Sequence, residues 1–145
     1  MRSRYGIVAV VAVLAGVLGY LRDPAWIASQ TTGMWDREQG PDGSWYRWTN
    51  SHASFFVPAD ASAARLRLST TFDADDAEPI LVTVSVDDVR AARLVLADAG
   101  WHDLVVALPP KGSRRERRID IRTNRVRAGN RGVRVADVQL MRQGS

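Results

Sequence analysis

The residues best suited to binding chemistry are the aromatic and arginine side chains of the segment Trp45-Tyr46-Arg47-Trp48. Successive side chains of a β-strand point to opposite faces, so Trp45 and Arg47 are expected on one face and Tyr46 and Trp48 on the other. An exposed indole can stack on a sugar ring, and an arginine fork can bind hydroxyl, carboxylate or phosphate oxygens. We therefore predict a ligand platform formed by Trp45 and Arg47 and assisted by Asn50.

The other aromatic residues are expected to be structural. Tryptophan is usually largely buried, so we expect Trp48 and Tyr46 to fill the core and Trp101 to begin a buried strand. Trp45 has an alternative interpretation, in which it covers the edge of a sheet. Asp42, close to Trp45 in the sequence, is a further candidate for contacting a sugar hydroxyl.

A second candidate site is the arginine-rich C-terminal part of the chain, where Arg118 and Arg122 lie on the outward face of a predicted strand. Residues 111–145 hold 11 basic and 3 acidic side chains, whereas residues 23–110 hold 6 basic and 13 acidic ones. Arginine binds phosphate and carboxylate groups through paired hydrogen bonds. The candidate partners are an anionic glycan, a lipid headgroup or an envelope protein. The alternative is a solvated face whose arginines pair with the acidic block of the same domain.

No group of residues predicts catalysis. The chain contains no cysteine, which excludes disulfides, cysteine nucleophiles and thiolate metal sites. Its two histidines, His52 and His102, lie in no nucleophile motif and have too few neighbouring ligands for a metal ion. The acidic run 73–78 lacks the glycine and distal glutamate of a calcium-binding loop, so we interpret it as a polar hairpin loop. We predict no catalytic residue, no metal site and no cofactor.

The N-terminal segment predicts a membrane helix. Residues 7–21 contain neither a charge nor a proline. As a helix, residues 5–21 are about 25 Å long, at the short end for crossing a bilayer. We predict a transmembrane signal-anchor helix over residues 5–21. A cleaved signal peptide and a buried helix of a soluble protein are the alternatives.

The charges beside this segment predict its orientation. Arg2 and Arg4 precede it, whereas Arg22 is followed at once by Asp23. The positive-inside rule therefore places residues 1–4 in the cytoplasm and the rest of the chain outside a bacterial cytoplasmic membrane, in the periplasm or beyond the cell. A stalk is predicted over residues 22–33. An exported domain does not meet nucleic acid, so we exclude it as a partner.

The remainder of the sequence predicts an all-β domain over residues 34–143. Apolar residues recur with a period of two, as in Ile80, Val82 and Val84, and turn signals such as Asp87-Asp88 separate the runs. About eight or nine short strands with irregular loops favour a two-sheet sandwich of the jelly-roll type. The predicted strands are 34–38, 45–50, 53–57, 64–72, 80–86, 89–96, 100–108, 116–123 and 133–141.

The order of three motifs resembles a known kind of domain. Trp45-Tyr46-Arg47-Trp48-Thr49, then Phe55-Phe56-Val57-Pro58, then Leu66-Arg67-Leu68 are similar to the opening of galactose-binding-like, carbohydrate-module-like jelly rolls of bacterial cell-envelope proteins. The likeness covers roughly residues 34–142. Related domains are often attached to membrane glycosyltransferases, and no multi-pass enzyme accompanies the domain in this sequence. The resemblance implies a jelly roll and, by fold analogy, sugar binding.

These observations predict a membrane-anchored extracytoplasmic binding or interaction module, with cell-envelope glycans as the candidate ligand. The alternative is a structural subunit whose helix and β domain both dock onto a membrane complex of the envelope. A hydrolase is ranked third, because no catalytic constellation supports it.

Overall fold

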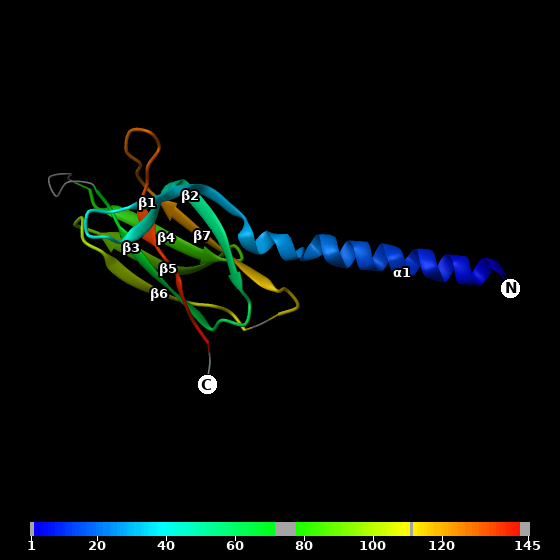
Figure 1. Cartoon of the computed structure of the whole chain (residues 1–145). Coiled ribbons are helices and arrows are strands. Elements are labelled where there is room, and N and C mark those ends of the chain that lie inside the picture. The colour runs from blue at the N-terminus through cyan, green and yellow to red at the C-terminus, as the bar shows by residue number, and fades with distance from the viewer. Residues whose placement is uncertain (1, 72–77, 111, 143–145) are drawn as a thin grey trace.

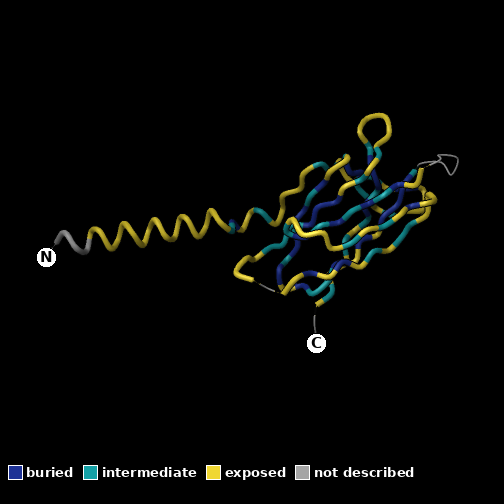
Figure 2. The backbone as a smooth tube through the Cα atoms, turned by 180° about the vertical axis from the view of Figure 1, so that it is seen from behind, coloured by how far each residue is buried: buried dark blue, intermediate teal, exposed yellow. Residues whose placement is uncertain are grey.

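The computed structural model describes residues 2–71, 78–110 and 112–142. A single helix, α1 (Arg2–Arg22), extends away from a compact β domain (Figure 1). The segment Gly6–Ser29 is long and apolar enough to cross a membrane, and residues 6–22 of its helical part are exposed (Figure 2). A helix that is apolar all round and has no protein partner is suited to lipid. By length and composition, α1 fits either a membrane anchor or a signal sequence.

A short connection leads from α1 into the domain. Pro24 follows the helix and cannot extend it, because it lacks the backbone N–H and clashes with the preceding turn. One 3₁₀ turn, η1 (Ala25–Ser29), comes next. The first strand then begins at Thr31, so the predicted stalk over residues 22–33 overlaps this strand and is shorter than expected.

The described residues of the domain contain nine strands, in agreement with the eight or nine that the alternating pattern predicts. All pairings between them are antiparallel. Their bounds are β1 (Thr31–Gln39), β2 (Trp45–Pro58), β3 (Ala63–Ser69), β4 (Ile80–Val86), β5 (Val89–Leu96), β6 (His102–Ala107), β7 (Glu116–Thr123), β8 (Arg134–Ala136) and β9 (Gln139–Met141).

The strands form one continuous sheet that curls over on itself. Its order is β5-β4-β7-β2-β8-β3-β6, with β1 paired to β2 and β9 paired to β3. The long strand β2 belongs to both halves, because residues 46–48 pair with β8 and residues 52–58 pair with β7. The all-β class, the strand number and the N-terminal apolar helix are confirmed, and the two layers of the sandwich are joined through β2.

The inner faces of the two halves make the hydrophobic core (Figure 2). Leu66 and Leu68 of β3 face it from one half, and Val84 of β4 and Ile121 of β7 face it from the other; all four are fully buried. Side chains between them in the sequence point outward, as in the alternation of Arg65 with Leu66. Burial of these apolar side chains is the main force that holds the two halves together.

Three of the predicted strands are joined or divided differently in the structure. Residues 45–50 and 53–57, which were predicted as two strands, belong to the single strand β2. Backbone hydrogen bonds of Thr49 with Val133 and Gly132 help to keep this strand continuous through the polar residues between the two predicted strands. Conversely, the strand predicted over 133–141 is divided into β8 and β9. The division falls at Asp137 and Val138, where Asp137 forms an ion pair with β1.

Turn chemistry explains the local connections. Asp87 and Asp88, the predicted hairpin tip, both have positive φ angles, 48° and 70°. Two such residues are typical of a type I′ turn, whose twist matches the flanking strands. The acidic run 73–78 lies outside the described residues except for Glu78, so its interpretation as a hairpin loop stays a prediction.

Candidate functional site

Tyr46 and Trp48 lie on the outer face of the sheet, where they form a small cluster separate from the core. Trp48 is opposite Arg134 in the pairing of β2 with β8, and Arg134 is opposite Ser69 of β3. Trp48 is only 6% exposed, yet it packs edge-on against Tyr46 and is not among the residues of the hydrophobic core. Trp48 is buried, as predicted, but it packs in this aromatic cluster and not in the main hydrophobic cluster between the two halves of the sheet.

Arginine side chains cover this outer cluster. The Arg134 guanidinium lies 5.1 to 5.9 Å from the ring centroids of Tyr46, Trp48 and Trp101. The Arg131 guanidinium lies 5.3 Å from Trp35 and 5.4 Å from Trp48. Arginine stacks favourably on aromatic faces and binds water more weakly than lysine does. We call this group the aromatic–arginine face; its members are Trp35, Tyr46, Trp48, Trp101, Arg131 and Arg134.

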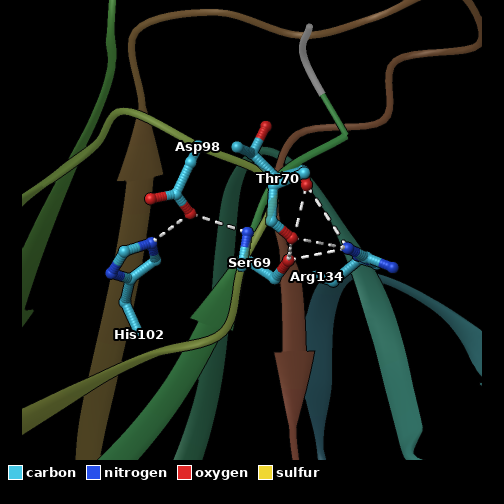
Figure 3. Close-up of polar contacts among 7 residues, drawn as sticks. Ser69, Thr70, Asp98, His102 and Arg134 are labelled. Atoms are coloured by element: carbon cyan, nitrogen blue, oxygen red, sulfur yellow. Dashed lines mark hydrogen bonds and ion pairs between the residues drawn. The ribbon is translucent and has the colours of Figure 1, made fainter. Parts of the chain in front are cut away.

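Polar contacts fix the same arginine in place. Arg134 Nη2 donates to Ser69 Oγ at 2.6 Å and to the carbonyl of Thr70 at 3.3 Å (Figure 3). Trp101 is half-buried on this face, and its Nε1 donates to Asp42 at 3.3 Å. The expectation that Trp101 lies in the core was therefore wrong, and Asp42 is engaged with it. Because its rings and guanidinium groups already contact one another, this face is chiefly structural.

Trp45 and Arg47 lie on the opposite side of β2, as the alternation predicts. Arg47 is opposite Val135, a core residue, so its side chain stands at the margin of the core. Trp45 is 45% exposed. The Arg37 guanidinium stacks on the Trp45 ring at 5.1 Å from its centroid, and it also forms an ion pair with Asp137 at 2.6 Å.

A groove of about 360 Å³ opens between β1, β2 and the segment that connects β8 with β9. Most of its lining residues are apolar, and Arg37, Arg47 and Asp137 are the charged ones. Within the described part of the chain, the Arg47 guanidinium makes no hydrogen bond and no ion pair, although the Arg47 backbone pairs with β1 and β8. The lining residues are Ala28, Thr31, Met34, Arg37, Tyr46, Arg47, Phe55, Phe56, Val135, Ala136, Asp137 and Val138. The arrangement resembles ligand pockets in general, which are mostly apolar with a few oriented polar groups.

The other predicted ligand residues lie elsewhere. Asn50 accepts a hydrogen bond from Trp35 Nε1 at 2.8 Å, at the aromatic–arginine face. Arg118 and Arg122 lie on β7, in the other half of the sheet. Arg122 is exposed, opposite His52. The structure therefore brings Trp45 and Arg47 together and separates them from the remaining three candidates.

Arg118 is held by carboxylates of the same domain. Its Nε donates to Asp120 at 2.9 Å, and its Nη2 donates to Asp88. The hydrogen bond that Arg118 donates to Asp120, together with the charges of Asp120 and Asp88, raises the pKa of Arg118 above its ordinary value. Arg117 is similarly paired with Asp87 at 3.0 Å. The pairing of the basic C-terminal part with the acidic block, given above as the alternative, accounts for these arginines.

Each histidine contacts a single carboxylate. His52 Nε2 lies 3.0 Å from Asp120, and His102 Nε2 lies 2.8 Å from Asp98 (Figure 3). The hydrogen bond from His102 is the main cause of the lowered pKa of Asp98. In the part of the chain that the structure describes, no serine or threonine hydroxyl bonds to either ring, and no group of three His, Asp or Glu side chains is placed to hold a metal ion.

No protein-family model matches the chain, and no curated protein matches its sequence. Solved structures share its fold. The M60 catalytic domain with the CBM51-1 and CBM51-2 domains from Clostridium perfringens ZmpB gives a TM-score of 0.51 at 13% identity, over 81% of this chain and 15% of that one. The CBM36-1 domain of a multidomain xylanase from the hindgut metagenome of Trinervitermes trinervoides gives 0.49 at 9% identity, over 82% and 95%. A family two carbohydrate esterase from Cellvibrio japonicus gives 0.47 at 16% identity, over 81% and 34%.

At these identities the likeness concerns the fold alone. The chain spans about a third or less of the Clostridium and Cellvibrio structures. The first of these likenesses, to a structure that includes two carbohydrate-binding modules, supports the carbohydrate-module-like fold that the three motifs predicted. The ligand and the role of the domain must be argued from its own residues.

Proposed function

We propose that this protein is a membrane-anchored, extracytoplasmic module that binds cell-envelope glycans and has no catalytic role of its own. The observation that carries the proposal is the groove beside β1. There, the Arg47 guanidinium, which has no partner among the described residues, belongs to a mainly apolar lining. The exposed indole of Trp45 is outside that lining, two residues away on the same face of β2. The anchoring part rests on α1, which is apolar over residues 7–21 and exposed over residues 6–22.

The chemistry of the groove suits a sugar ring with an acidic substituent. A sugar has an apolar face that can stack on Trp45, and hydroxyl groups that Arg37, Asp137 and Thr31 can bind. Arg47 adds a fork of donors that matches a carboxylate bidentately. Thr31 of β1 and Asp137 of the β8–β9 connection both line the groove, so a ring that fills it would contact both segments.

The side of the membrane follows from the charges of the helix ends. Arg2 and Arg4 precede the apolar segment, and the arginine after it has Asp23 beside it. This distribution favours an N-terminus in the cytoplasm and a β domain outside, where envelope glycans are found.

The test is a glycan array probed with the full-length protein in detergent, at low and at moderate salt. Trp45→Ala and Arg47→Ala should each weaken binding at least tenfold, since each removes a group that faces the ligand. Arg65→Ala, which removes an exposed arginine from the outer face of β3, is the matched control and should bind as the unmodified protein does.

Salt separates the two contributions. Binding through Arg47 should weaken as salt rises, because ions screen exposed charges, whereas stacking on Trp45 should persist. The proposal is wrong if no glycan binds, or if the Arg65→Ala control loses as much binding as the two groove variants. Retained binding in both groove variants would instead place the site on another face of the domain.

A further inference from the structure

The base of α1 is joined to a loop that is distant in the sequence. The Asp23 carboxylate, at the end of the helix, accepts a hydrogen bond from the backbone N–H of Arg115 at 2.7 Å. Arg115 directly precedes β7, so the loop before this strand is held against the helix end. The orientation of the β domain relative to the helix is therefore fixed at two places, at this contact and at the covalent connection through η1.

A hollow of about 490 Å³ lies between the helix and this loop. On the helix side it is lined by Gly16 and Gly19, and no atom lies within 4 Å of where a side chain would begin at either position. This side of the hollow is consequently open to whatever surrounds the helix. The lining residues are Gly16, Gly19, Tyr20, Arg22, Asp23, Ser113, Arg114 and Arg115.

The polar end of the hollow is positively charged. Arg22, Arg114 and Arg115 all line it, and within the described residues none of their guanidinium groups forms an ion pair. Asp23 is the one carboxylate in the lining, and one of its oxygens already accepts the bond from the loop. The residues that face the hollow thus carry an excess of positive charge.

The hollow is also placed at the right depth for a lipid headgroup. Gly16 and Arg22 are separated by roughly 9 Å along a helix that rises about 1.5 Å per residue. The headgroup layer is about 5–7 Å thick on each side of a bilayer. With Arg22 at the inner edge of the headgroup layer, as the predicted span of residues 5–21 requires, Gly16 and Gly19 lie in the adjoining hydrocarbon. Trp26, 57% exposed in η1, has the amphipathic side chain that favours the same layer.

We propose that this hollow binds one anionic phospholipid, with its phosphate between Arg22, Arg114 and Arg115 and an acyl chain along Gly16 and Gly19. The inference rests on the anchoring part of the proposed function and is independent of glycan binding. A lipid held in this way neutralises the arginines and locks the loop to the helix. It thereby sets the face that the β domain presents outward.

The first test is native mass spectrometry of the full-length protein, released from detergent in the presence of phosphatidylglycerol or phosphatidylcholine. The protein should retain one phosphatidylglycerol molecule and little phosphatidylcholine. The double variant Arg114→Gln/Arg115→Gln should lose this preference by roughly tenfold or more. The matched control, Arg90→Gln/Arg93→Gln, removes two exposed arginines from β5 and should retain it.

The second test uses the absence of cysteine from the chain. A Ser113→Cys variant carries one nitroxide label on the lining of the hollow, and it is reconstituted into vesicles with and without phosphatidylglycerol. The label should become immobilised when the anionic lipid is present, and should stay mobile when Arg114 and Arg115 are both replaced by glutamine.

The outcomes separate the two proposals. Equal retention of both lipids, or equal losses in the double variant and its β5 control, overturns the lipid site and leaves the anchor untouched. A protein that is washed from the vesicles by alkaline carbonate overturns the anchor, and the lipid site with it. Glycan binding is measured separately in detergent, so its failure has no bearing on either result.

Discussion

Trp45 and Trp48 lie three residues apart on β2, and their side chains have opposite surroundings. Trp48 is buried beneath Arg131 and Arg134, and its Nε1 donates to Glu38 at 3.2 Å. Trp45 is exposed and contacts chiefly the guanidinium of an arginine on β1. The two residues therefore have different parts, Trp48 in stability and Trp45 in the proposed binding.

Replacement of each tryptophan by alanine should distinguish these two roles. Trp48→Ala should lower the free energy of unfolding by about 3–5 kcal/mol, as for other large buried side chains. Trp45→Ala should cost about 1 kcal/mol or less, because it removes an exposed ring and one cation–π contact. Thermal unfolding of the full-length protein in detergent, followed by near-ultraviolet circular dichroism, measures both. Near-equal losses would contradict the assignment of the two faces.

Glu116, at the start of β7, provides a prediction about pH. Its pKa is raised, first by burial and then by the charges of Asp23 and Asp60. Its Oε2 is buried without a hydrogen-bond partner among the described residues. A carboxyl whose pKa is higher in the folded state takes up a proton on folding, so its contribution to stability decreases as pH rises through the interval between the two pKa values.

The variant Glu116→Gln removes this unfavourable charge. It should melt at a higher temperature than the unmodified protein at pH 7, and the difference should vanish in acid, where Glu116 is protonated in both the folded and unfolded states. Melting temperatures of both proteins over a pH series test the prediction. A Gln variant that is less stable at neutral pH would show that the carboxylate has a favourable partner.

The sequence predicted which side chains share a face but not which face is inside. Alternation alone separates Trp45 and Arg47 from Tyr46 and Trp48. Which of these two faces points inward is decided by the partner strand β8. Val135, opposite Arg47, belongs to the core, and Arg134, opposite Trp48, does not. One sequence signal was missed. Arg131 and Arg134, on either side of Gly132-Val133, are the two arginines whose guanidinium groups cover the buried aromatic rings.

At the scale of the elements, β1 is the strand that shows the strongest local constraint. Its pairing with β2 shifts register between Thr32 and Met34, and Gly33 between them has a φ of 65°. A side chain at Gly33 would begin 2.0 Å from the backbone oxygen of His52. Glycine is required there, both for the positive φ angle and for the close approach of the two backbones.

Gly33→Ala should therefore detach β1 and lower the free energy of unfolding by about 3 kcal/mol or more, since it combines backbone strain with a clash. Gly43→Ala is the matched control, because Gly43 has a φ of 78° but no atom near its missing side chain. It should cost only about 1 kcal/mol. Hydrogen exchange of the β1 amides locates the damage. Equal costs at the two glycines would mean that the close approach at Gly33 can relax.

The strands that were predicted best are those with strict alternation and clear turns, such as β4 and β5 around Asp87-Asp88. The errors occur where a strand changes partners. β2 continues through the polar residues 50–52 because it pairs with β8 before them and with β7 after them. The run 133–141 divides because its first part, β8, pairs with both β2 and β3, whereas its second part, β9, pairs with β3 alone. A change of pairing partner depends on contacts between residues that are distant in the sequence, and local sequence patterns do not predict such contacts.

At the scale of the whole molecule, the long unburied helix and the β domain predict opposite environments for the two ends of the protein. The variant Ala128→Cys places a single thiol in an exposed loop of the domain. A membrane-impermeant maleimide should label it in intact bacterial cells that express the protein. Ser3→Cys should be labelled only after the membrane is permeabilised. Labelling of Ala128→Cys that also requires permeabilisation would place the domain in the cytoplasm.

The short connection through η1 also determines how mechanical tension would travel. Only residues 23–30 separate α1 from β1, and Thr31, Met34 and Arg37 of β1 form one wall of the groove. A pull between a captive ligand and the bilayer would therefore reach that wall before any other part of the sheet. The hydrogen bonds between β1 and β2 would bear the load. The same force would therefore favour both the dissociation of the ligand and the separation of β1 from β2.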